Sequence, residues 1–253
     1  MSGHSKWAQI KRQKGAADAK RGQLFTKLGK EISIAVRRGG ADPAANPHLR
    51  LAIEKARDNN MPLENIDRAI KRSSGAQDAS NLTEVTLEGY GPGGSAILLQ
   101  ALTDNRNRTL SEVRNVLSRN GGNLAESGSV SWIFEARGVL AVEADKMPAE
   151  ELALLAIDAG AEDVKVYDST VEVHTEPQDL EFMRGSLEGR GLHVSSAELL
   201  QVPKTVITLD EKSALQSLKL LSRLEELEDV NHVFTNADFP NDVVEKFQEM
   251  TEA

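Results

Sequence analysis

The sequence predicts an α+β protein of three domains, in which a small helical amino-terminal bundle precedes two ferredoxin-like α/β sandwich domains, one inserted in the other. Apolar residues recur at helical spacing through residues 24–70. After the linker at residues 73–76 the pattern changes to alternation, and strands then mix with helices up to about residue 235. A length of 253 residues also favours two or three compact units over one.

Three short amphipathic helices are expected in residues 24–75. The first ends at Gly39-Gly40, and the second begins with Asn46 as its cap and Pro47 in its first turn. The third follows Pro62. Each has an apolar stripe that needs partners to cover it, so the three should form a bundle. Residues 3–20 before them are basic and polar, which predicts an arm.

The next segment predicts two strands, a helix and a third strand. The strands span residues 83–90 and 95–103 and flank a glycine-rich turn. The helix is expected to open with a capping box formed by Thr109 and Glu112 and to end at residues 120–122. In the third strand, residues 129–135, alternation places Val130, Trp132 and Phe134 on one face.

Residues 138–202 have the strand and helix order βαββαβ, which is typical of a ferredoxin-like unit. The strand, helix and strand after it, within residues 206–234, would complete a second such unit with residues 95–135. We therefore expect an insertion, since loop closure tolerates long insertions. The expected domains are residues 1–75, residues 80–137 together with 203–240, and residues 138–202. An acidic tail, residues 241–253, is expected to be a solvated or fraying end.

Charge is distributed unevenly along the chain. The net charge of −9 combines +9 over residues 1–75 with −18 over residues 76–253. This asymmetry favours contact between the amino-terminal end and a polyanion. Alternatively, the basic and acidic parts face each other within the molecule.

Basic residues are dense at the amino-terminal end and predict phosphate contacts. Trp7 lies among them and either stacks on an unpaired base or anchors the arm. Arg106 and Arg108, in a polar loop expected before a helix, could clamp phosphate or RNA, or could belong to a solvated loop. The candidate nucleic-acid-binding residues are Lys6, Trp7, Lys11, Arg12, Lys14, Lys20, Arg21, Lys27, Lys30, Arg37, Arg38, Arg106 and Arg108.

Several classes of function lack support in the sequence. Residues 89–94 match G-x-G-x-x-G, but a strand follows where a dinucleotide site needs a helix, so we expect a loop between paired strands. The chain has no cysteine, and its five histidines lack metal-ligand spacing. With no catalytic constellation either, we expect neither an enzyme nor a cofactor or metal. No apolar run approaches a membrane span or a secretory signal, which predicts a cytoplasmic protein without membrane contact.

Several short motifs are distributed along the chain: Gly3-His4-Ser5-Lys6-Trp7, Phe25-Thr26-Lys27-Leu28, Asn59-Asn60-Met61-Pro62, Gly89-Tyr90-Gly91-Pro92, the stretch from Thr103 to Thr109, Gly121-Gly122-Asn123-Leu124 and Ser127-Gly128-Ser129-Val130. Together they closely resemble the YebC family, and the match runs nearly end to end. The resemblance implies three domains, a helical one and two α+β ones. It also implies a role in gene expression, because bacterial members are described as probable transcriptional regulators, and relatives include mitochondrial translational activators of cytochrome oxidase.

The leading hypothesis is a nucleic-acid-binding regulator of gene expression, with DNA as the target that the family's description favours. A translation factor associated with ribosomal RNA is the alternative, because the net −18 of the remainder would be repelled by a long duplex. A protein-interaction module is a third hypothesis, in which the acidic domains bind a protein partner. We expect a monomer or a weak oligomer.

Overall fold

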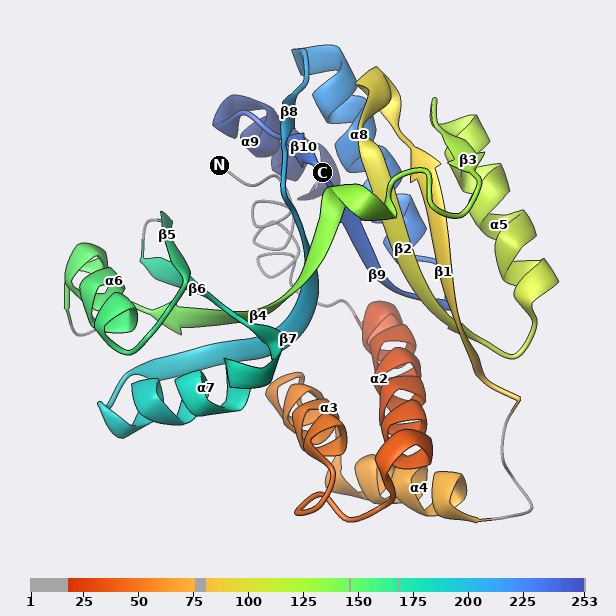
Figure 1. Cartoon of the computed structure of the whole chain (residues 1–253). Coiled ribbons are helices and arrows are strands. Elements are labelled where there is room, and N and C mark those ends of the chain that lie inside the picture. Colours follow the sequence, from red (N-terminus) through yellow and green to blue (C-terminus); the bar gives the residue numbers. More distant parts are fainter. Residues whose placement is uncertain (1–17, 76–80, 146, 168, 253) are drawn as a thin grey trace.

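The structure is a computed structural model that describes residues 18–75, 81–145, 147–167 and 169–252. It confirms a mixed α/β fold in which helices at the amino-terminal end precede antiparallel sheets (Figure 1). Within the described part of the chain, no helix has both the length and the apolar composition needed to cross a bilayer.

The amino-terminal bundle consists of α2 (Asp18–Gly39), α3 (Pro47–Asp58) and α4 (Leu63–Ser74). The cap of α3 is confirmed, because the Asn46 side chain accepts a hydrogen bond from the Leu49 amide at 3.1 Å. The same side chain donates to the carbonyls of Ala35 and Gly40, both at 2.8 Å, and so fixes α3 against the end of α2. Helix α2 begins six residues before Leu24, so the end of the expected arm is helical. The bundle core contains Leu28, Ile32, Ala35, Val36, Leu49, Ile53, Ala56, Met61 and Ile66.

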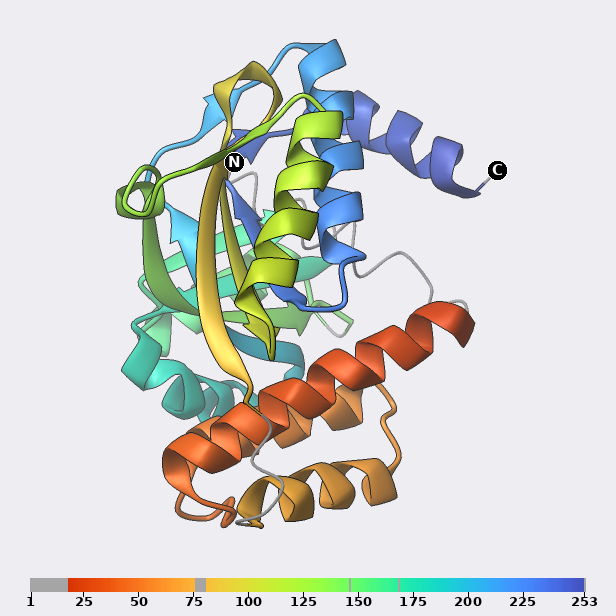
Figure 2. The ribbon, with the colours of Figure 1, turned by 90° about the vertical axis from the view of Figure 1, so that its right-hand side faces the viewer.

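The middle domain contains a four-stranded antiparallel sheet in the order β3-β1-β2-β9. Its strands are β1 (Thr83–Tyr90), β2 (Ala96–Thr103), β3 (Asn123–Ala125) and β9 (Val230–Thr235). Helices α5 (Arg106–Arg119) and α8 (Glu211–Glu225) cover one face of this sheet (Figure 2). A 3₁₀ turn at Pro92–Gly94 joins β1 to β2, which confirms the expected loop between paired strands.

The connectivity of this sheet differs from the expected second βαββαβ unit. The strand expected at residues 206–209 is only β8 (Ile207–Thr208), which pairs in parallel with β10 (Ala237–Asp238) outside the sheet. Its expected place between the other strands is taken by β1. A hairpin closed by the short glycine-rich turn has a small loop-closure cost, so β1 pairs with β2 more easily than a strand that follows the insertion.

Two local expectations in this domain are wrong. Helix α5 begins at Arg106, not at Thr109, because Asn105 is the cap and accepts from the Arg108 amide at 3.1 Å. Residues 131–133 form a 3₁₀ turn rather than a strand, and Trp132 is 67% exposed. The buried Glu88 carboxylate accepts hydrogen bonds from three backbone amides of residues 128–131, which favours a turn there.

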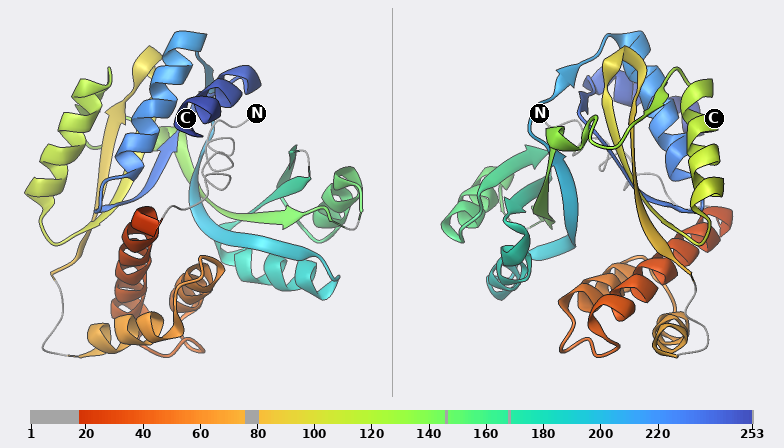
Figure 3. Two further views of the ribbon diagram at one scale, coloured as in Figure 1. Left: turned by 180° about the vertical axis from the view of Figure 1, so that it is seen from behind. Right: turned by 45° about the vertical axis from the view of Figure 1, so that its right-hand side comes forward.

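Residues 134–203 form a ferredoxin-like domain with the sheet order β5-β6-β4-β7, as the βαββαβ pattern predicted. The two long strands β4 and β7 pair from Phe134↔Pro203 to Glu143↔His193, so the chain enters and leaves this domain side by side (Figure 3). The predicted boundaries at residues 138 and 202 fall within this paired region, and the domain limits remain a prediction. The elements are β4 (Phe134–Glu143), α6 (Ala149–Asp158), β5 (Asp163–Tyr167), β6 (Thr170–Thr175), α7 (Leu180–Gly189) and β7 (His193–Pro203).

The acidic tail is not a solvated end over its described length. It forms α9 (Asn241–Glu252), which packs on α8 and buries Val243 and Phe247, each 1% exposed. Apolar residues at positions 243, 244 and 247 have the spacing of one helical face. The acidic composition of the segment hides this short pattern when the sequence is considered alone.

Candidate nucleic-acid interface

The predicted binding residues are only partly within the described chain. Lys6, Trp7, Lys11, Arg12 and Lys14 lie outside the described residues, and Lys20 belongs to the first turn of α2. Arg21 is exposed on α2. The structure therefore locates the cations of α2 and α5 and leaves the contribution of the arm a prediction.

The cations in the middle of α2 contact the end of α8 and the turn that precedes β9. Lys27 Nζ donates to the Glu225 carbonyl at 2.5 Å, and Lys30 Nζ lies 2.8 Å from Asp229 Oδ1. Near the end of the same helix, Arg37 and Arg38 contact the start of the β1 region. Their acceptors are the Leu82 carbonyl, at 2.7 Å, and Glu84 Oε2, at 2.5 Å. At these four positions the basic helix faces acceptors of the middle domain, as the alternative interpretation of the charge asymmetry describes.

Asp229 is the centre of a buried polar cluster. Its side chain is 2% exposed, and its Oδ2 atom lies 2.7 Å from Arg108 Nη2 and 2.8 and 3.0 Å from the hydroxyls of Thr109 and Thr103. Burial by itself would raise the pKa of Asp229, but hydrogen bonds from Lys30, Arg108 and Thr109 hold it well below its usual range. The cluster fixes α2 and α5 to the turn before β9.

Arg106 and Arg108 lie in the first turn of α5, so the expected loop before the helix is wrong for both. Arg108 is bound to Asp229 and to Asp104 Oδ1, at 2.8 Å, and its hydrogen bonds to these two carboxylates raise its pKa. Arg106 is exposed. The structure thus separates the pair, because Arg108 has a structural partner and Arg106 faces solvent.

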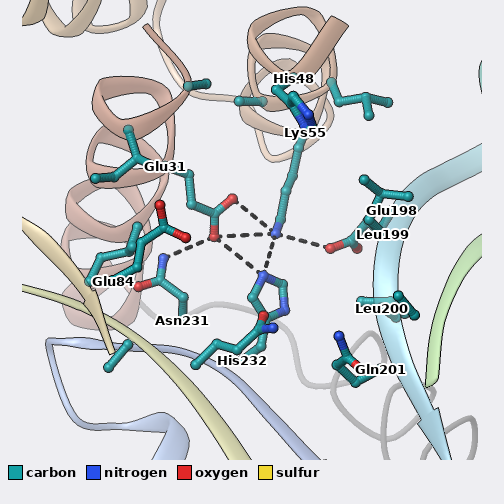
Figure 4. Close-up of a pocket in the computed structure, with 18 of the residues that line it drawn as sticks. Glu31, His48, Lys55, Glu84, Glu198, Leu199, Leu200, Gln201, Asn231 and His232 are labelled. Atoms are coloured by element: carbon teal, nitrogen blue, oxygen red, sulfur yellow. Dashed lines mark hydrogen bonds and ion pairs between the residues drawn. The ribbon is translucent and has the colours of Figure 1, made fainter. Parts of the chain in front are cut away.

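A second polar cluster lies where the three domains meet (Figure 4). Lys55 Nζ of α3 is 3.1 Å from Glu31 Oε2 of α2, 3.0 Å from Glu198 Oε2 of β7 and 3.4 Å from His232 Nε2 of β9. Glu31 also accepts from the Asn231 amide group at 2.9 Å. Burial would lower the pKa of Lys55, but Glu198 and Glu31 hold it above its ordinary value. Burial would likewise raise the pKa of Glu31. This effect is outweighed by the nearby charges of Lys55 and His232 and by the hydrogen bond from Asn231, so the pKa is lowered.

This cluster forms part of the wall of a pocket of about 380 Å³ between α2, α3, β1, β2, β7 and β9. Apolar side chains, Glu84, Thr86 and the amides of Gln100 and Gln201 form most of the rest of the wall, and the exposed Arg38 and His48 also line the pocket. The pocket and Asp229 were not predicted. Their residues come from segments far apart in the chain, and no local motif links them.

Among the described residues, no group of three or more His, Asp or Glu side chains is placed to hold a metal ion. In the Lys55 cluster, the point at which two carboxylates and an imidazole converge is occupied by the Lys55 ammonium group. The geometry of the two clusters supports a role in attaching the domains to one another. The geometry of the pocket supports recognition of a ligand by hydrogen bonds.

Comparison with known proteins gives matches over nearly the whole chain. The model of the TACO1/YebC protein N-terminal domain matches residues 5–76, and that of the TACO1/YebC second and third domain matches residues 82–237. A probable transcriptional regulatory protein of Dehalococcoides mccartyi is 56% identical over 247 residues, 98% of each chain. One of Chloroflexus aggregans is 53% identical over 250 residues, 98% of this chain and 99% of that one. The crystal structure of the conserved hypothetical protein Aq1575 from Aquifex aeolicus has a TM-score of 0.86 and 46% identity, and covers 93% of this chain and 97% of that one.

Proposed function

The chain belongs to the TACO1/YebC family, and from that premise we propose that it regulates gene expression by binding nucleic acid through its basic amino-terminal part. The observation that carries the proposal is the net charge of +9 over residues 1–75 in a chain whose net charge is −9. Such a density of Lys and Arg neutralises phosphates and releases counterions, which is the main source of sequence-independent affinity. The relatives named above are described as regulators, and the proposal includes no catalytic step, cofactor or metal.

Within the basic part, we assign the first phosphate contacts to the arm. Lys27, Lys30, Arg37 and Arg38 already bind oxygens of the middle domain. Lys11, Arg12 and Lys14 precede α2, and Trp7 lies beside them in the sequence. The arm therefore supplies the contacts that need no rearrangement of the domains.

DNA is the target that the names of the relatives favour, and RNA is the second candidate. The net charge of −18 over residues 76–253 supports RNA, because a long duplex lying along the molecule would be repelled by it. A structured RNA, such as ribosomal RNA, can instead receive the basic end alone. We place the protein in the cytoplasm, as a monomer or weak oligomer that can also contact a protein partner through its acidic domains.

The test is a binding titration of the full chain and of residues 18–253 against a DNA duplex and an RNA stem-loop. We expect deletion of residues 1–17 to abolish binding while the melting temperature stays within a few degrees, because α2 begins at Asp18. If about five phosphates are contacted, log affinity should fall against log salt with a slope of roughly −4. Unchanged affinity of the shortened chain at low salt would contradict the proposal. The duplex and the stem-loop then decide between DNA and RNA.

Trp7→Ala separates stacking from anchoring. If Trp7 stacks on a base, its loss should weaken binding to single strands or RNA loops by about 1–3 kcal/mol and leave duplex binding nearly unchanged. An equal loss on every ligand, together with a lower melting temperature, would assign Trp7 to anchoring.

A further inference from the structure

The pocket where the three domains meet has the size and chemistry of a ligand site. Its volume of about 380 Å³ lies within the range of about 300–1,000 Å³ that small-molecule sites occupy, and such sites are frequent at domain interfaces. Apolar residues such as Ile34, Leu51 and Leu102 line it together with a few polar groups. Arg38 and His48, both exposed, lie at its edge, so the pocket is open to solvent.

The imidazole ring of His232 forms part of one wall of the pocket. The His232 imidazole stacks on Phe234, with ring centroids 5.7 Å apart and an angle of 6° between the planes. Phe234 is fully buried and supports the imidazole from the side of the core, while 20% of the His232 side chain remains exposed and lines the pocket. A planar aromatic ligand can therefore stack in line with this pair.

Three carboxamide side chains line the pocket together with the His232 ring. Gln100 is the register partner of His232 on the neighbouring strand β2, and Gln201 lies on β7. Within the described part of the chain, neither glutamine side chain forms a hydrogen bond, and the Oδ1 atom of Asn231 is buried without a partner. Asn231 is 9% exposed and lines the pocket, but its Oδ1 atom is enclosed by protein atoms, so the carboxamides that a ligand can reach are those of Gln100 and Gln201.

The charged residues of the pocket, in contrast, have partners among themselves. Lys55 contacts both Glu31 and Glu198, and Glu31 accepts from Asn231 (Figure 4). These groups fix the positions of the walls. Besides Thr86 and His48, the polar groups available to a ligand are consequently the carboxamides of Gln100 and Gln201 and the His232 ring, which together favour a neutral planar molecule over an ion.

We propose that this pocket binds an unpaired adenine base, which stacks on His232 and pairs its amino group and adjacent ring nitrogen with the carboxamides of Gln100 and Gln201. A carboxamide presents one donor and one acceptor side by side, which matches the N6 and N7 edge of adenine. The base comes from a single strand, so the inference rests on the proposed function and adds a base-reading site to its phosphate contacts.

The experiment compares the full chain with Gln100→Leu/Gln201→Leu, which removes both amides and keeps the charged cluster intact. Gln216→Leu, at an exposed glutamine of α8 outside the pocket, is the matched control. The probes are an oligouridine of about 12 nucleotides with one central adenine, the same strand with an abasic site at that position, and free AMP. A thermal melt of each variant verifies that it is folded. Replacing the adenine by 2-aminopurine reports stacking through its fluorescence.

We expect the full chain and Gln216→Leu to bind the adenine strand about 10-fold more tightly than the abasic strand, and the double variant to lose this difference. Equal binding of both strands by the wild-type chain would overturn the adenine site and leave the proposed function intact. Binding of AMP that depends on the glutamines, without binding of either strand, would overturn the single-stranded ligand in favour of a free nucleotide, and the titration with the duplex and the stem-loop would still test the proposed function. Failure of all three probes would overturn the adenine site, and the proposed function would then be decided by the titration with the duplex and the stem-loop.

Discussion

Arg108 Nη2 lies 2.7 Å from Asp229 Oδ2 and joins the first turn of α5 to the turn before β9. The other oxygen of the same carboxylate accepts from Lys30 of α2 at 2.8 Å. A single buried acid therefore connects the amino-terminal bundle to two elements of the middle domain. This contact also explains why two of the predicted phosphate-binding residues have partners inside the molecule.

Asp229→Asn should lower the free energy of unfolding by about 2–3 kcal/mol, because it removes the negative charge that Lys30 and Arg108 share in a buried place. Glu228→Gln is the matched control, since the Glu228 side chain is 68% exposed and its contact with Lys30 is long, 3.8 Å. Urea denaturation measures both. Equal effects of the two substitutions would show that the buried cluster contributes nothing specific.

The contribution of Asp229 to the free energy of unfolding should disappear at acid pH. Its pKa is lowered in the folded protein, so the unfolded chain takes up the proton first as the pH falls. The stabilisation is thus fully present above the unfolded pKa of about 3.9 and is lost as the pH falls through the lower folded pKa. The difference in urea midpoint between wild type and Asp229→Asn should be constant from about pH 5 to 8 and should shrink below about pH 4. A difference that is unchanged at pH 3 would contradict the assignment.

The two sets of predicted cations should behave differently when replaced by alanine. Replacement of Lys11, Arg12 and Lys14 should reduce the slope of log affinity against log salt by about one unit for each lost contact. It should leave the stability of the fold unchanged. Replacement of Lys27 and Lys30 should instead lower the stability of the fold, because these side chains bind Glu225 and Asp229. It should change the slope of log affinity against log salt little. Titrations at several salt concentrations, with a thermal melt of each variant, test this. An equal flattening by both sets would mean that nucleic acid displaces the middle domain from α2.

The parts of the fold that follow from local chemistry were predictable from the sequence. The Asn46 cap, the turn at Pro92–Gly94 and the βαββαβ order of the inserted domain are each encoded by neighbouring residues. The clusters around Asp229 and Lys55 were not predictable, because each joins residues that are remote in the chain and identical in type to many surface acids and bases. For the same reason the cations of α2 were predicted as exposed phosphate ligands, whereas their partners come from the middle domain.

Lys55→Met should weaken the attachment between the three domains. It leaves Glu31 and Glu198 partly buried without their cation, so we expect a loss of about 2–3 kcal/mol in the free energy of unfolding. Lys71→Met, at an exposed position of α4, is the control. Hydrogen exchange should show lower protection in α3 and β7 for Lys55→Met alone. Unchanged protection there would mean that the apolar contacts between the domains suffice.

Phe247→Ala tests the carboxyl-terminal helix. Phe247 is 1% exposed and belongs to the core shared with α8, so its truncation should cost about 3 kcal/mol or more. Glu249→Ala, on the same helix, should change the melting temperature little. If both variants melt like the wild type, α9 contributes nothing to the fold, and the original expectation of a solvated tail would apply.

The inserted domain should fold on its own when it is cut at the ends of its paired strands. Residues 134–203 contain the complete ladder between β4 and β7 and a core of their own around Leu140, Val173 and Leu187. A cut at residues 138 and 202 would remove the start of β4 and leave Leu200, Gln201 and Val202 without their partners, so the shorter piece should be less stable. Dispersed amide signals from the longer piece, with a lower melting temperature for the shorter one, are the expected result.

The remainder, closed by a short linker, should stay folded but expose the apolar group around Leu98 and Phe234. That group packs against Phe134 and Leu200, which leave with the excised piece. Binding of a hydrophobic dye by the remainder, reversed when the excised domain is added back, would establish that the two units are separate yet share this small core. A remainder with the spectrum of an unfolded chain would mean instead that the insertion is needed for the middle domain to fold.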